Sequence, residues 1–139
     1  MSSYISVAHR RIVSQRSGCG CEYCLIHEDD AFFSFEIDHI ISEKHGGLTH
    51  PDNLAHTCFF CNRFKGSDIG SVLLPDMEFI RFYHPRKDAW QEHFKLENGV
   101  IQPLTDIGEV TAKILKFNDV DRIIERRLLI EVGRYPSRK

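Results

Sequence analysis

Cys21-Glu22-Tyr23-Cys24 and Cys58-Phe59-Phe60-Cys61 are two Cys-x-x-Cys pairs in a chain of 139 residues. Two thiolate pairs of this spacing can close a tetrahedral zinc site, and four sulfur ligands leave no coordination position open to a substrate. Zinc bound in this way would fix both ends of residues 25–57, so that stretch becomes a loop with a defined position. The predicted zinc ion is therefore structural, and its ligands are Cys21, Cys24, Cys58 and Cys61.

The length favours a single compact domain over residues 1–139, with a small core that a structural metal would help to stabilise. No apolar run approaches the roughly 18 residues that a membrane span requires, and the polar start of the chain lacks the apolar region of a secretory signal. We therefore expect no membrane association and a cytoplasmic location, where paired cysteines are more often metal ligands than disulfides. Cys19 is left over, either as a loop thiol or as a replacement for Cys21 among the ligands.

The charged residues are unevenly distributed, although a net charge of −2 gives no overall support for a nucleic-acid partner. Residues 1–21 contain Arg10, Arg11 and Arg16 and no acidic residue. A short helix is expected over residues 5–17, so these arginines would share one element. Basic clusters are often only solvated surface. The charge pattern therefore permits a nucleic-acid contact here without requiring one.

The residue pattern around the second cysteine pair predicts two strands and a helix. Residues 31–41 are rich in aromatic and β-branched side chains and predict a strand, residues 54–57 predict a short returning strand, and residues 59–67 predict a helix. The expected unit is ββα, closed at its base by zinc. Strict alternation along the first strand puts Asp38 and His39 on opposite faces. A bend near Asp38 is therefore expected if both residues serve one site.

The second half of the chain predicts packing elements. Asn98-Gly99 is a strong turn signal for a hairpin. Thr105 is expected to cap a helix, and Asn118 with Asp121 resembles the capping box of a last helix. Residues 69–89 show no clear period and are expected to wrap round the core.

Asp38-His39 taken alone is weak evidence for a reaction centre, because a histidine beside an acid is more often structural. Combined with Asn53, Asn62 and the cysteine pairs it becomes specific, and residues 21–66 resemble the HNH endonuclease family with its ββα-metal core. The matching motifs are Cys21-Glu22-Tyr23-Cys24, Asp38-His39-Ile40, His45-Gly46-Gly47, Asn53-Leu54 and Cys58-Phe59-Phe60-Cys61-Asn62-Arg63-Phe64-Lys65-Gly66.

The resemblance completes the expected fold class, which is α+β. A zinc-stapled ββα-metal HNH core would occupy about residues 21–68. An N-terminal helix would precede it, and a packing extension over about residues 69–139 would add a hairpin and two helices.

The resemblance also implies a role for each site residue. His39 would be the general base that activates water, and Asn53 would brace the hairpin and orient that base. Asp38 and Asn62 would hold the catalytic ion, and oxygen donors of this kind suit Mg²⁺ or Mn²⁺. Where the family pattern has an apolar residue this chain has His56, either a contact to phosphate or metal or a solvent-facing strand residue.

Arg63 and Lys65 follow on the same predicted helix. They are expected to contact the phosphate backbone of the nucleic acid, and the competing interpretation is that they only keep the helix soluble.

The predicted function is metal-dependent hydrolysis of DNA phosphodiester bonds by an endonuclease, with double-stranded DNA favoured as the partner. The alternative is a non-catalytic zinc-ribbon module that binds nucleic acid or protein. Such a module would keep the cysteines but would not need Asp38, His39, Asn53 and Asn62 together. A thiol redox role fits the two cysteine pairs poorly. DNA or RNA preference, target sequence, nicking or double-strand cleavage, and oligomeric state stay open at the level of sequence.

Overall fold

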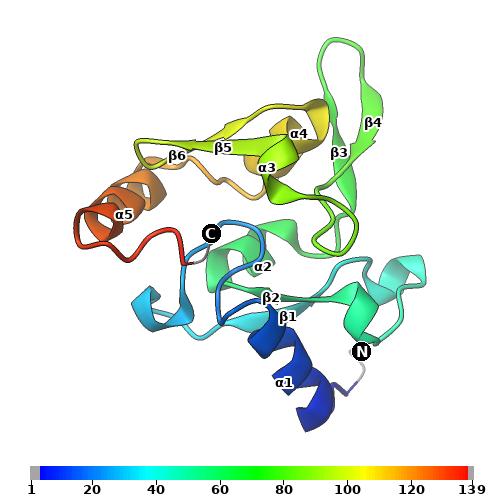
Figure 1. The fold of residues 1–139 in the computed structure, drawn as a ribbon. Helices are drawn as coiled ribbons and strands as arrows, with labels where there is room; N and C mark the ends of the chain where they lie inside the picture. Colours follow the sequence, from blue (N-terminus) through cyan, green and yellow to red (C-terminus); the bar gives the residue numbers. More distant parts are fainter. Residues whose placement is uncertain (1–3, 138–139) are drawn as a thin grey trace.

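The computed structural model describes residues 4–137, which form an α+β fold of short hairpins and helices. Helix α1 and the first hairpin form one half of the molecule, and the later hairpins lie on the other side of α2 (Figure 1). In this part of the chain no helix is both long and apolar enough to cross a membrane. The elements in order are α1 (Val7–Arg16), a 3₁₀ turn (Glu28–Asp30), β1 (Glu36–His39), two 3₁₀ turns (Glu43–His45, Pro51–Asn53), β2 (Leu54–Thr57), α2 (Phe59–Lys65), β3 (Gly70–Leu73), β4 (Glu78–Arg81), α3 (Trp90–His93), β5 (Phe94–Glu97), β6 (Val100–Pro103), α4 (Asp106–Ile114) and α5 (Val120–Glu131).

The predicted ββα unit is confirmed. Strands β1 and β2 pair antiparallel, with Asp38 opposite Ala55. Helix α2 follows at once, and its N-cap is Cys58, whose sulfur accepts a hydrogen bond from the backbone N–H of Cys61 at 3.4 Å. The second cysteine knuckle is therefore also the start of the helix.

The strand predicted over residues 31–41 is too long, since β1 covers only Glu36–His39. Its partner β2 has four residues between a 3₁₀ turn and the knuckle at Cys58, so it offers pairing to four residues only. The preceding aromatic residues lie outside the sheet. Phe32 is 92% exposed, and the ring of Phe33 packs 4.6 Å from that of Phe59.

Helix α1 lies against the hairpin and is two residues shorter at its start than predicted. Its N-cap Ser6 accepts a hydrogen bond from the backbone N–H of His9. Val13 is fully buried and packs in a small cluster with Leu54 of β2. Arg16 donates hydrogen bonds to the carbonyl of Pro51 in the 3₁₀ turn before β2 and to that of Leu54 at the start of β2, each at 2.6 Å. These contacts hold α1 beside the ββα unit.

The C-terminal hairpin and helices follow the prediction in part. Asn98 and Gly99 adopt positive φ in the turn between β5 and β6, and the Thr105 side chain caps α4 by accepting from the backbone N–H of Gly108 at 3.0 Å. The predicted capping box of α5 is wrong. Asn118 instead hydrogen-bonds both the N–H and the C=O of Ile101, each at 2.9 Å, and so ties the start of α5 to strand β6.

Residues 69–89 contain a hairpin, β3 with β4, that the sequence analysis missed. Its strands are four residues long, and β4 is exposed at three of its four positions. No alternation of buried and exposed side chains therefore marks them. The hairpin projects from the upper edge of the molecule (Figure 1).

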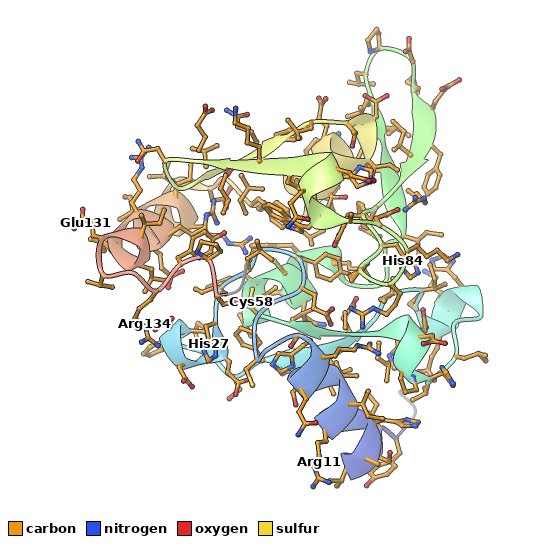
Figure 2. The ribbon with its side chains drawn as sticks, in the orientation of Figure 1. Arg11, His27, Cys58, His84, Glu131 and Arg134 are labelled. Atoms are coloured by element: carbon orange, nitrogen blue, oxygen red, sulfur yellow. The ribbon has the colours of Figure 1, made fainter. Side chains whose placement is uncertain are left out.

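The main hydrophobic core is shared between the two halves, and Cys58 lies near its centre (Figure 2). Three hydrogen bonds tie the extension to backbone carbonyls of the first cysteine knuckle. Trp90 Nε1 donates to Tyr23 at 2.8 Å, and the Tyr135 hydroxyl donates to Cys24 at 2.6 Å. The backbone N–H of Ser137 donates to the carbonyl of Leu25, directly after the knuckle, at 2.9 Å. The extension therefore packs directly on the knuckle.

Candidate nuclease site and four-cysteine cluster

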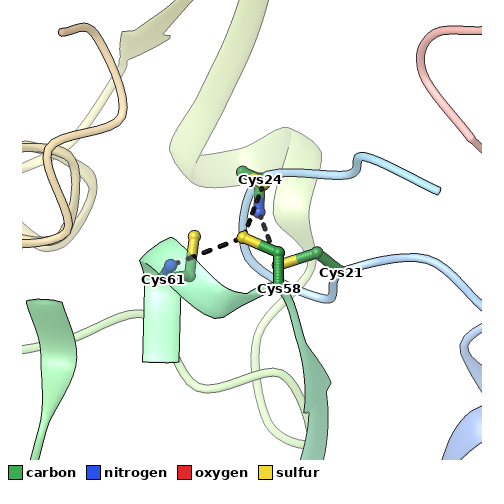
Figure 3. A group of neighbouring side chains, drawn as sticks. All are labelled: Cys21, Cys24, Cys58 and Cys61. Carbon is green, nitrogen blue, oxygen red and sulfur yellow. Dashed lines mark hydrogen bonds between the residues drawn. The ribbon is translucent and has the colours of Figure 1, made fainter. Parts of the chain in front are cut away.

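The predicted zinc ligands form one buried cluster (Figure 3). Their sulfur atoms all lie within 4.8 Å of one another, and the sulfurs of Cys24 and Cys58 are 3.7 Å apart. Zn–S bonds of about 2.3 Å in a tetrahedron separate the sulfurs by about 3.8 Å, whereas a disulfide would bring them to about 2.0 Å. The four thiol groups therefore fit a tetrahedral zinc ion.

Local backbone geometry supports the same interpretation. The N–H groups of Cys24 and Cys61 point at the sulfurs three residues earlier, Cys21 and Cys58, at 3.5 and 3.4 Å. Hydrogen bonds from the neighbouring cysteines hold the pKa of the Cys24 thiol well below its ordinary value, although burial opposes this. Cys21 is inside the cluster, so the idea that Cys19 replaces it is wrong. Burial raises the pKa of Cys19, which remains a half-buried thiol.

A cleft of about 650 Å³ opens beside β1 and the second half of α2. Asp38, His39 and Asn62 all line it, so three of the four predicted catalytic residues face the same space. Arg10 of α1 and Lys44 of the loop also line the cleft. In the sequence Arg10 stands out only as part of a basic cluster, and no sequence signal points to Lys44.

Asp38 is 4% exposed and makes close contacts with two buried side chains. Its Oδ1 accepts a hydrogen bond from Lys65 Nζ at 3.2 Å, and its Oδ2 accepts one from the Tyr23 hydroxyl at 3.2 Å. Lys65 Nζ also lies 3.1 Å from Oδ2. Burial raises the pKa of Asp38, and the attraction of Lys65 offsets only part of that rise.

Lys65 is buried and does not lie on the protein surface. Its side chain is 1% exposed, and Nζ lies 3.1 Å from the backbone carbonyl of His39 as well as beside Asp38. The prediction that Lys65 contacts phosphate is therefore wrong, because its ammonium group is held inside the protein. Arg63 is exposed on the same helix, with its guanidinium 5.4 Å from the ring centre of Phe59.

His39 is the last residue of β1 and is half-buried. Its Nε2 lies 2.9 Å from the hydroxyl of Thr49, which fixes the orientation of the ring. Within residues 4–137 no hydrogen bond engages Nδ1, the other ring nitrogen. The chain bends at Ile40 and Ile41, directly after His39 and not near Asp38 as predicted.

Asn53 does not line the cleft but braces the loop that carries His39. Its Oδ1 accepts from the N–H of Ile41, and its Nδ2 donates to the carbonyls of Ile41 and Leu48, all at 2.9 Å. The loop passes so close to Gly47 that a Cβ there would lie 1.7 Å from the Ile41 carbonyl oxygen. The position of Asn53 therefore matches the predicted bracing role in geometry.

His56 is not a solvent-facing strand residue. It is 7% exposed, and its Nε2 lies 2.8 Å from Glu28 Oε1. Its ring packs 5.0 Å from that of Phe35. His56 is not among the residues that line the cleft, so its partner is the carboxylate of Glu28 and not the space that Asp38 and Asn62 face.

Comparison with known proteins agrees with this geometry. The family model of the HNH endonucleases matches residues 21–68. The Septu protein PtuB of Bacillus thuringiensis is 26% identical over 116 residues, and the alignment covers 79% of this chain and 41% of that protein. The chain thus spans about two fifths of the length of this relative. No solved structure matches it. Residues 21–68 form an HNH endonuclease domain whose ββα core contains a buried cluster of four cysteines.

Proposed function

We propose that the protein is a metal-dependent endonuclease that hydrolyses phosphodiester bonds of DNA. One observation carries this proposal. Asp38, His39 and Asn62 line a single cleft, and Asn62 follows directly on a cysteine of the buried cluster. A binding module would need the cysteines alone. The reduced thiols of a zinc cluster are consistent with a reaction in the cytoplasm.

His39 is the proposed general base. Thr49 holds Nε2, so Nδ1 accepts the proton of the water that attacks phosphorus. Imidazole is the side chain most often used as a general base in enzymes. Asn53 fixes the backbone that follows His39 and thereby limits the movement of the base.

Asp38 and Asn62 are the proposed ligands of Mg²⁺ or Mn²⁺. A carboxylate has about four acceptor sites, and Lys65 and Tyr23 make three contacts with Asp38. One site remains for an ion, and within residues 4–137 no hydrogen bond engages the side-chain amide of Asn62. A bound ion supplies positive charge for the non-bridging and leaving oxygens of the phosphate. Lys65 is a positioning residue in this scheme, because it contacts both Asp38 and the carbonyl of His39.

The proposed DNA surface runs from the cleft along α1. A second groove of about 360 Å³ shares Arg10, Glu36 and Ile37 with the cleft and is also lined by Arg11. Arg10 and Arg11 are both exposed, and Figure 2 shows Arg11 at the far end of α1. Arginine side chains along a groove suit the phosphates of a nucleic-acid backbone.

Cleavage of supercoiled plasmid with Mg²⁺ or Mn²⁺ tests the proposed activity. His39→Ala should retain zinc and DNA binding but lose about 10²–10⁴ in rate. The control is His45→Ala, which removes an exposed histidine from the loop that follows β1. Wild-type cleavage by the His39→Ala protein would overturn the mechanism. If the wild type cleaves neither DNA nor RNA with any divalent ion, the protein is a binding module.

Salt-dependent binding tests the proposed surface separately. Replacing Arg10 and Arg11 by Ala should weaken binding to unrelated DNA sequences and reduce the salt slope by about one for each lost phosphate contact. Arg127→Ala removes an exposed arginine on α5, which does not line either groove, and should change neither quantity. Equal effects of the two sets of replacements would place the DNA elsewhere.

A further inference from the structure

Arg122 of α5 brings a guanidinium group to the four-cysteine cluster. Its Nη2 lies 3.1 Å from the sulfur of Cys61 and 3.8 Å from that of Cys58. The side chain is 8% exposed. Its other terminal nitrogen, Nη1, donates to the backbone carbonyls of Leu115 and Lys116 at 2.7 and 3.1 Å. The end of α4 therefore holds the guanidinium against the sulfurs.

Four thiolates around a divalent zinc ion leave a net charge of −2 in a buried site. Burying a charge without a partner costs much free energy, and hydrogen bonds to charged groups are among the stronger ones in proteins. The backbone N–H groups of Cys24 and Cys61 supply part of the compensation as dipoles. Arg122 supplies a full positive charge, shared between both sulfurs of the second knuckle.

We propose that Arg122 is a positioning residue for zinc, and that through it the C-terminal extension controls how tightly the second knuckle retains the metal. Arg122 lies far outside residues 21–68, so the HNH domain depends for this charge on a helix beyond its own boundary. The partners that orient metal ligands typically change metal affinity by about 10–100-fold when they are removed. This inference does not depend on nuclease activity.

The same contact connects the extension to the catalytic cleft. Cys61 and Asn62 are neighbours on α2, and Asn62 lines the cleft. A knuckle that loses zinc would therefore release the helix that carries Asn62. The rings of Phe60 and Phe117 also lie beside the guanidinium, each ring centre 5.9 Å from the Arg122 carbon atom Cζ.

Arg126 offers a matched control on the same helix. It lies four residues after Arg122 and is 2% exposed. Its guanidinium donates to the backbone carbonyls of Gly99 and Phe117, both at 2.7 Å. No sulfur is among its hydrogen-bond acceptors in the part of the chain that the structure describes. Arg122→Met and Arg126→Met therefore both remove a buried, hydrogen-bonded charge near the cluster, but only the first removes hydrogen bonds to the sulfurs.

The experiment measures zinc transfer from the full chain to a chromogenic chelator, at fixed pH and at equal intervals below the melting temperature of each variant. Arg122→Met should release zinc about 10–100-fold faster than Arg126→Met, and Arg122→Lys should fall between Arg122→Met and the wild type. Equal release rates for Arg122→Met and Arg126→Met would overturn the proposal. If Arg122→Met does not fold, Arg122→Lys against Arg126→Lys decides the question by the same measurement.

Discussion

Replacing Lys65 by Met removes an ammonium group that lies among two oxygens of Asp38 and the carbonyl of His39. The carboxylate left behind is 4% exposed, and the Tyr23 hydroxyl is the one donor that remains to it within residues 4–137. Removing one partner of a buried ion pair typically costs about 3–5 kcal/mol, because the remaining charge is uncompensated. Domains of this kind have a total free energy of unfolding of about 5–15 kcal/mol, so we expect the Lys65→Met protein to lose about a fifth of its stability or more.

A double-mutant cycle measures the interaction free energy between Lys65 and Asp38 apart from their contacts with other groups. Asp38→Asn also leaves a buried charge unpaired, but in the double variant the pair is absent. The cost of the double variant should therefore fall about 1–3 kcal/mol below the sum of the single costs. Arg63→Met is the control, since Arg63 is exposed on the same helix and should cost less than about 1 kcal/mol.

Urea unfolding at a fixed excess of zinc, followed by fluorescence of Trp90, measures these free energies. Trp90 is the one tryptophan in the sequence, and its indole donates to the first cysteine knuckle, so its emission should report unfolding of the core. If Lys65→Met costs no more free energy of unfolding than Arg63→Met, the buried ion pair does not stabilise the fold as expected. The expected coupling between Asp38 and Lys65 is likewise refuted if the cost of the double variant equals the sum of the costs of Asp38→Asn and Lys65→Met.

Three further outcomes are expected. Cys58→Ala should lose zinc by elemental analysis and lose cooperative unfolding by circular dichroism, because structural zinc supplies folding free energy. Asn53→Ala removes three hydrogen bonds to the loop backbone; it should cost about 1–3 kcal/mol in urea unfolding and lower cleavage while zinc content is unchanged. Hydrogen bonds from Arg81 hold the pKa of Asp88 below its ordinary value of 3.8, so the stabilisation by Asp88 is complete above that pH and lost below it. Asp88→Asn should therefore be less stable at neutral pH but lose less stability in an acid titration.

The sequence by itself determined the features that depend on short-range spacing. Two Cys-x-x-Cys pairs give the same tight knuckle twice, because a backbone N–H meets the sulfur three residues earlier. Asn98-Gly99 sets its turn through two residues that tolerate positive φ, and Thr105 caps α4 through a side chain that reaches the third residue on. The ββα order followed from elements that are neighbours in the chain.

Only the tertiary structure decided which polar side chains are buried and what pairs with them. Lys65 has the spacing of a surface residue on a short helix, yet it is buried against Asp38 and His39 of β1. His56 contacts Glu28, and Cys61 of the second knuckle contacts Arg122, although both partners come from segments distant in the chain. Local pattern fixes hydrogen bonds within a few residues, whereas the burial of a charge depends on elements that meet only when the core forms. The contacts of Lys65, His56 and Arg122 therefore depend on tertiary packing and could not be predicted from local sequence spacing.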